Sequence, residues 1–199
     1  LRALIWDVDG TLAETERDGH RLAYNQAFDE LGVPWHWDVP GYGALLKITG
    51  GKERMRHWWR GLDPRAADQP EAQALIRQLY ERKSAHYATL VRSGAVVLRP
   101  GVQRLLAEAR QRGLVLAIAT TTHEANVHEL LRATLGNEAS RWFAVLGAGD
   151  VVPHKKPAPD IYHWVLERLR LPASECLALE DSAVDRKSTR LNSSHATLS

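Results

Sequence analysis

The sequence predicts an α/β fold in which a parallel sheet carries an all-helical insert after its first strand. Two observations favour this fold. Beyond residue 93, short apolar runs alternate with helical patterns, which is typical of βαβ units and a parallel sheet. From residue 14 to residue 92, every periodic segment is helical. We therefore expect a core domain formed by 1–13 and 93–184, and an inserted helical domain formed by 14–92.

The first strand is predicted from the short apolar run 3–6, which ends at Asp7. Such a run indicates a strand buried on both faces, as in a parallel sheet. In the insert, apolar residues recur at helical spacing over 17–31, and Gly32 follows as a typical C-terminal cap. A loop over 33–43 is rich in turn residues and tryptophan, and we expect its tryptophans to pack in a core. Further helices of the insert are expected at 42–48, 49–59 and 71–92.

The core domain resumes after the turn Arg99-Pro100-Gly101. Three further short apolar runs predict strands at 114–119, 142–146 and 176–179. Helices are expected before the first of these strands, at 102–112, and between them, at 124–135 and 161–169. Because parallel strands all point one way, the residues that follow each strand should gather at one edge of the sheet, where open α/β folds bind their ligands.

Composition excludes several classes of function. A formal charge of +2 over 199 residues, with dispersed basic residues, argues against nucleic-acid and membrane partners. No apolar run approaches the about 20 residues of a membrane span. The chain enters its first strand at once, so we expect no signal peptide. The single cysteine, Cys176, fits a reducing compartment. We expect a cytoplasmic monomer that acts on a small molecule.

Four carboxylates follow the first and the last predicted strands. Asp7 and Asp9 come directly after the first, and Glu180 and Asp181 after the last. Buried acids are costly unless a cation lies among them, and carboxylate oxygens are the ligands that Mg²⁺ prefers. The sequence therefore indicates a magnesium site at this edge, although Asp-x-Asp-Gly is also an ordinary turn composition.

Other residues at the same edge suit a phosphate group. Thr120 ends the second strand, and the amides around Thr121 and Thr122 precede a helix, where anions bind. Lys156 supplies a cation shortly before the last predicted helix. A metal, a phosphate and an acid at one place describe phosphoryl transfer. Because side chains two residues apart on a strand share a face, both aspartates can reach one phosphorus atom. Asp7 can attack it, and Asp9 can protonate the leaving oxygen and later activate water.

These segments, in this order, resemble the four motifs of the haloacid dehalogenase superfamily. The motifs are Asp7-Val8-Asp9-Gly10-Thr11, Thr120, Lys156-Pro157-Ala158-Pro159-Asp160 and Glu180-Asp181-Ser182. The resemblance implies a Rossmann-like core with a small helical cap and Mg²⁺-dependent chemistry. Within the superfamily, 13–16, 49–54, 119–122 and 155–157 resemble the CbbY family. That likeness implies a phosphatase acting on a sugar bisphosphate, xylulose-1,5-bisphosphate, an inhibitor of Rubisco in the Calvin cycle.

The resemblance also implies a role for each site residue. Asp7 would be the nucleophile and Asp9 the general acid and base. The metal ligands would be Asp7, the carbonyl of Asp9, Glu180 and Asp181. Substrate would be bound at its transferring phosphate by Thr120, Thr121, Thr122 and Lys156. In the cap, Gly50, Gly51, Lys52 and Arg54 would hold a distal phosphate, and Glu16 and His20 would lie near the sugar.

Several alternatives stay open at this point. Gly50 and Gly51 could form a plain turn beside solvated basic residues, and His20 could be an ordinary polar helix position. A β-phosphoglucomutase-type phosphomutase would share the cap, both aspartates and the lysine. A catalytically dead, truncated chain is a further alternative.

The end of the sequence departs from the family pattern. Asp185 stands where the family has a glycine, and an alanine-rich helix does not follow. We expect the last βα unit to be missing, and 185–199 to be a disordered tail foreign to the native chain.

Overall fold

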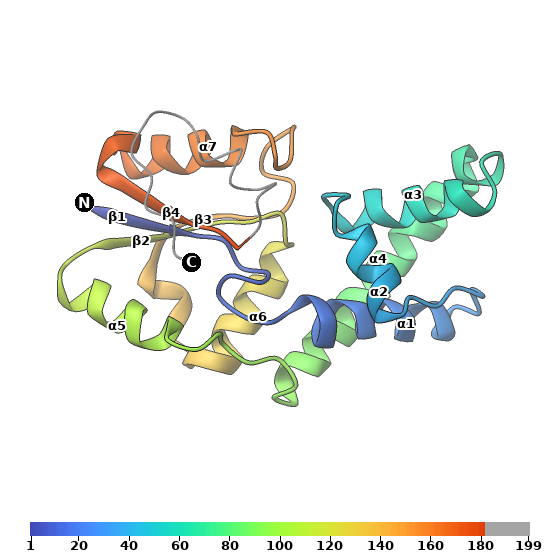
Figure 1. Ribbon diagram of the computed structural model, residues 1–199, viewed down its shortest axis with the longest axis horizontal. Coiled ribbons are helices and arrows are strands. Elements are labelled where there is room, and N and C mark those ends of the chain that lie inside the picture. The colour runs from blue at the N-terminus through green and yellow to red at the C-terminus, as the bar shows by residue number, and fades with distance from the viewer. Residues whose placement is uncertain (182–199) are drawn as a thin grey trace. The chain divides into compact units, whose positions relative to one another are not determined.

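The computed structural model describes residues 1–181, which form two compact units (Figure 1). The sheet unit comprises Leu1–Glu14 and the chain from Val97 onward, and the helical unit comprises Thr15–Val96. The expected foreign tail and the expected absence of a last βα unit concern residues outside the described range. None of the described helices is both long enough and apolar enough to cross a bilayer.

The sheet unit contains a four-stranded, fully parallel sheet in the order β3-β2-β1-β4. The central strand β1 is Ala3–Trp6, and all four of its residues are buried. It pairs with β2 and β4, so that Ile5 lies level with Ala117 and Ala178. The strand bounds are β2 Val115–Ala119, β3 Phe143–Gly147 and β4 Cys176–Leu179. The predicted α/β fold with a parallel sheet is confirmed, and predicted and observed strands differ by at most one residue at either end.

Helices cover both faces of the sheet (Figure 1). α5 (Val102–Gln111) and α6 (Glu124–Leu135) lie on one face, and α7 (Asp160–Leu169) lies on the other. α7 packs so closely on β3 that a Cβ atom at Gly147 would lie 2.8 Å from Val165. Short 3₁₀ turns occupy η3 Ala139–Trp142 and η4 Ala173–Glu175. The connection from β3 to β4 thus contains α7, which packs mainly on β3 and β2.

The helical unit contains four α-helices. A π-helical turn, η1 (Glu16–His20), leads into α1. The predicted helix 42–48 is wrong in its bounds, because Asp38 caps a helix that begins at Val39 and accepts a hydrogen bond from the Gly41 amide at 2.7 Å. The other bounds are α1 Arg21–Glu30, α2 Val39–Leu45, α3 Gly51–Leu62, η2 Ala66–Asp68 and α4 Pro70–Arg92.

An aromatic core holds the helical unit together. Trp35 and Trp37 are buried in it, with Tyr24, Phe28 and Tyr42 around them. A buried amide fixes the loop that carries these tryptophans. The Asn25 side chain donates to the Trp37 carbonyl and accepts from the Trp37 amide, each at 2.9 Å. The expected packing role of the loop tryptophans is confirmed, and the Asn25 side chain satisfies the backbone polar groups of Trp37.

We predict that Asn25→Ala lowers the free energy of unfolding by about 2 kcal/mol, since it leaves the buried Trp37 amide without the Asn25 acceptor, while Arg21 Nη1 still donates to the Trp37 carbonyl at 3.3 Å. Urea unfolding followed by tryptophan fluorescence measures the change. Gln26→Ala, at an exposed position of the same helix, is the matched control and should change the free energy by less than about 0.5 kcal/mol. Equal effects of the two substitutions would contradict the role given to Asn25.

Candidate active site

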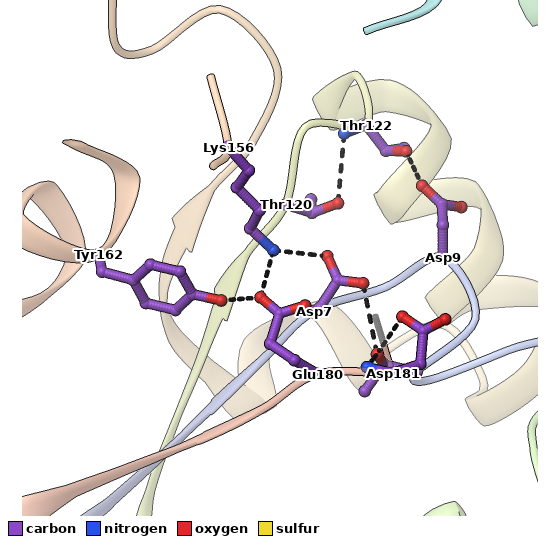
Figure 2. A network of polar contacts seen from close by, with 9 residues as sticks. Asp7, Asp9, Thr120, Thr122, Lys156, Tyr162, Glu180 and Asp181 are labelled. Carbon is purple, nitrogen blue, oxygen red and sulfur yellow. Dashed lines mark hydrogen bonds and ion pairs between the residues drawn. The ribbon is translucent and has the colours of Figure 1, made fainter. Parts of the chain in front are cut away.

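Asp7 lies directly after β1, where the backbone still follows the sheet. Its amide donates to the Leu179 carbonyl at 3.1 Å, so the ends of β1 and β4 stay paired. The carboxylate is 5% exposed, and its Oδ1 accepts a hydrogen bond from Lys156 Nζ at 2.9 Å (Figure 2). The lysine compensates a charge that burial alone would make costly.

Lys156 connects two acids that lie far apart in the sequence. Besides Asp7, Lys156 Nζ donates to Glu180 Oε1 at 2.6 Å. The side chains of Lys156 and Glu180 are each 1% exposed. The Tyr162 hydroxyl donates to the same Glu180 oxygen (Figure 2). Water is thus excluded from a group of two carboxylates and one ammonium, where electrostatic interactions are strong.

Asp181 completes a cluster of carboxylates. Ligand oxygens of Asp7, Glu180 and Asp181 lie within 4.8 Å of one another. The Thr11 hydroxyl is 3.3 Å from Asp7 Oδ2 and 3.3 Å from Asp181 Oδ1, and it accepts from the Asp181 amide at 3.1 Å. The cluster has three carboxylates, and the Lys156 ammonium, which contacts Asp7 and Glu180, supplies one positive charge, so negative charge is in excess and every candidate metal ligand is a hard oxygen. This set fits Mg²⁺.

Gly10 makes room for this cluster. Its φ of +80° is one that side chains rarely adopt, and a Cβ atom there would lie 2.8 Å from Asp181 Cγ. Two reasons therefore require glycine at position 10: the positive φ of the turn after Asp9 and the close approach of the Asp181 carboxylate.

Asp9 has a different neighbour from the clustered acids. Its Oδ2 accepts a hydrogen bond from the Thr122 hydroxyl, just before α6 (Figure 2). Its carboxylate is not one of the three in the cluster. The two aspartates of the first motif thus face different groups, Lys156 for Asp7 and Thr122 for Asp9.

The threonines at the end of β2 form a tight turn. Thr120 is fully buried, and its amide donates to the Gly147 carbonyl at 2.9 Å. Its hydroxyl accepts from the Thr122 amide at 3.2 Å. Thr121 is half-buried between them. The turn places three hydroxyl-bearing residues between the end of β2 and the first turn of α6, which begins at Glu124.

In the helical unit, Arg54 and Glu16 meet through a tyrosine. The Tyr42 hydroxyl donates to Glu16 Oε2 at 2.6 Å and accepts from Arg54 Nη1 at 2.8 Å. Burial, reinforced by the Glu16 carboxylate, raises the pKa of Tyr42 well above its usual value, so the hydroxyl stays protonated. Arg54 also donates through Nε to the Leu45 carbonyl at 3.2 Å. The guanidinium of Arg54 is therefore held firmly by its own unit.

Gly50 and Gly51 have structural reasons for being glycine. Gly50 has a φ of +94° where it caps α3, and a Cβ atom at Gly51 would lie 2.8 Å from Cε2 of Tyr80. Lys52 follows them, with its Nζ 5.2 Å from the centre of the Tyr80 ring. The two glycines form the start of α3, where Lys52 is half-buried and Arg54 is buried, so these basic residues are not both solvated as the plain-turn alternative requires.

His20 contacts a buried lysine that the sequence analysis missed. Its Nδ1 lies 2.9 Å from Lys83 Nζ, and its ring stacks on Tyr87 at 4.2 Å between centroids. Lys83 interrupts the apolar face of α4, and a cation in such a stripe is a signal that could have identified it. Tyr42 and Tyr162 were also missed, and Thr11 was identified as part of the first motif without a role. The two tyrosines lie among apolar residues, and no spacing shows where their hydroxyls reach.

A family model of haloacid dehalogenase-like hydrolases matches residues 1–190. The chain belongs to this family. The plasmid-encoded CbbY protein of Cupriavidus necator is 50% identical over 190 residues, which are 96% of this chain and 74% of that protein. A phosphorylated carbohydrates phosphatase of Thermotoga maritima is 29% identical over 186 residues, which are 92% of this chain and 77% of that enzyme.

Solved structures agree with this family assignment. CbbY from Rhodobacter sphaeroides, in complex with phosphate, has a TM-score of 0.87 at 43% identity and covers 96% of this chain and 82% of that one. A variant of the same protein, in complex with xylulose-1,5-bisphosphate, has a TM-score of 0.86 at 41% identity, with the same coverage. The resemblance read from the motifs is confirmed, and this chain is a haloacid dehalogenase-like hydrolase related to the CbbY proteins.

We predict that Gly10→Ala lowers kcat/KM for a sugar phosphate by at least about tenfold, because the new methyl group displaces the Asp181 carboxylate. Phosphate release with Mg²⁺ measures the loss. Gly101→Ala is the matched control, since Gly101 has a φ of +85° with no atom near its Cβ position. It carries the same backbone strain and should keep native kcat/KM. Equal losses in both variants would assign the effect to strain alone.

Proposed function

We propose that this phosphatase hydrolyses a sugar bisphosphate of the xylulose-1,5-bisphosphate type through an aspartyl-phosphate on Asp7. The observation that carries the proposal is the division of the two aspartates between Lys156 and Thr122. The substrate class is supported by the related CbbY structure that contains xylulose-1,5-bisphosphate. We further propose a cytoplasmic monomer that serves the Calvin cycle by removing an inhibitor of Rubisco.

A magnesium ion is part of the proposal. Asp7, Glu180, Asp181 and the carbonyl of Asp9 would hold it, and the observed cluster of three carboxylates suits that ion. When bound, the ion would neutralise charge on the oxygens of the transferring phosphoryl group.

In the first step, a carboxylate oxygen of Asp7 attacks phosphorus, and the ester oxygen leaves with the proton of Asp9. In the second step, Asp9 takes a proton from water as the water oxygen attacks phosphorus. Asp7 is regenerated and inorganic phosphate departs. Asp9 suits both transfers because the Thr122 hydroxyl holds its carboxylate apart from the clustered acids.

The transferring phosphate would be bound by Lys156 and the threonine turn. Lys156 Nζ lies beside Asp7, so its positive charge is at the place where the phosphoryl group must arrive. Thr120, Thr121 and Thr122 add hydroxyls and backbone amides next to the first turn of α6.

The helical unit would recognise the rest of the substrate. We assign the distal phosphate to the start of α3, with Gly50, Gly51, Lys52 and Arg54, and the sugar hydroxyls to Glu16 and His20. Because Arg54 is buried and bound to Tyr42 and Leu45, the half-buried Lys52 is the cation best able to meet a second phosphate.

We predict that Asp7→Asn lowers kcat by about 10³-fold or more, since no nucleophile remains. Asp9→Asn should lower kcat by about 10²–10⁴-fold through the lost proton transfer. It should leave Mg²⁺ affinity near the native value, because the carbonyl rather than the carboxylate would bind the ion. Phosphate release and titration calorimetry measure these effects, with the exposed Asp29→Asn as control. A large fall in Mg²⁺ affinity in Asp9→Asn would count against the assignment.

We predict that Lys52→Ala raises KM for a sugar bisphosphate about tenfold, the loss expected for one charge-assisted contact. It should leave KM for the matching monophosphate unchanged. Lys47→Ala, an exposed lysine of the same unit, controls for overall charge. A similar rise for both substrates would remove Lys52 from distal phosphate recognition.

A panel of sugar mono- and bisphosphates, with Mg²⁺, tests the proposed function itself. We expect free phosphate and a clear preference for a bisphosphate. Isomerisation at constant total ester would instead identify a phosphomutase. Absence of turnover on every substrate would identify an inactive chain.

A further inference from the structure

Tyr162 is a buried residue of α7 whose hydroxyl reaches the ion cluster of the sheet unit. It is 3% exposed, and its hydroxyl donates to Glu180 Oε1 (Figure 2). The same oxygen accepts from Lys156 Nζ at 2.6 Å. Tyr162 lies outside the motif residues that predicted the site, so no role had been given to it.

The aromatic ring of Tyr162 also borders the lysine. Lys156 Nζ lies 5.3 Å from the ring centroid, within the range of a cation–π contact. Tyr162 therefore touches both partners of a buried ion pair, the carboxylate of Glu180 through its hydroxyl and the ammonium of Lys156 through its ring.

Packing explains the ring but not the hydroxyl. Tyr162 belongs to an apolar cluster with Ile161 and Val165 of the same helix, and phenylalanine would fill this place equally well. The hydroxyl adds a hydrogen bond from a neutral donor to a carboxylate, and a bond of this kind is stronger than one between neutral groups, especially where water is excluded. Any functional effect of the Tyr162 hydroxyl must therefore act through the carboxylate of Glu180.

We propose that Tyr162 is a positioning residue that acts through Glu180 on Lys156, and thereby on Asp7. Glu180 Oε1 receives two donors, and together they fix the rotation of its carboxylate. A fixed carboxylate fixes Lys156 Nζ between Glu180 and Asp7, which are 2.6 and 2.9 Å away. Without the hydroxyl, the carboxylate of Glu180 turns toward its remaining donor and draws Lys156 from Asp7. The inference rests on the roles proposed above for Asp7 and Lys156.

A double-mutant cycle tests the coupling. Tyr162→Phe, Glu180→Gln and the double variant are compared with the native protein for kcat, KM and the affinity for inorganic phosphate by calorimetry. We expect Tyr162→Phe to lower kcat about tenfold, as is typical when a group that orients an active-site residue is lost, with little change in KM. On the Glu180→Gln background, the same substitution should change kcat and phosphate affinity by less than about twofold.

Trp164→Phe, on the same helix at a half-buried position, is the control for packing and should keep native kcat. The inference is overturned if Tyr162→Phe keeps native kcat, if it loses the same factor on both backgrounds, or if Trp164→Phe loses as much. A native protein that hydrolyses no phosphate ester would refute the proposed function instead, and phosphate affinity in the four proteins would still measure the coupling.

Discussion

The site depends on one buried arrangement of charge, in which Lys156 lies between Asp7 and Glu180 with Nζ–O distances of 2.9 and 2.6 Å. These residues come from the end of β1, the loop before α7 and the end of β4. A buried ion pair is retained only when its geometry is good, and loss of one partner costs about 3–5 kcal/mol. The chain between 7 and 180 must therefore fold so that these three side chains meet, and the parallel sheet achieves this by bringing the ends of β1 and β4 side by side.

Neighbouring groups give chemically identical carboxylates different tasks. Asp7 meets an ammonium, Asp9 meets the hydroxyl of Thr122, and Asp181 lies against Gly10 beside Thr11. A nucleophile needs to stay ionised, whereas a group that gives and takes a proton must be kept from the strongest cation. The spacing of the first motif supplies two acids, and the surrounding fold distinguishes them.

Much of this could be predicted from the sequence, for identifiable reasons. Strands buried on both faces are short apolar runs, and the ends of parallel strands meet at one edge, so the gathering of Asp7, Glu180 and Asp181 followed from topology. Lys156 lies in a loop before α7 and was predicted from the need for a cation beside a phosphate. The bounds of α2 could not be predicted from apolar periodicity, because the Asp38 cap decides where that helix starts. Tyr162 and Tyr42 were missed because the sequence pattern predicts that an aromatic ring is buried, but it does not predict which group the hydroxyl contacts.

The proposed mechanism requires that Asp7, held by Lys156, becomes phosphorylated during turnover. Rapid acid quenching of the native protein with Mg²⁺ and a sugar bisphosphate, followed by mass spectrometry of the N-terminal peptide, tests it most directly. We expect a phosphoryl group on Asp7 that forms before free phosphate and decays as phosphate appears. Complete release of phosphate in a single turnover, with no phosphoryl group on Asp7 at any time, would contradict it.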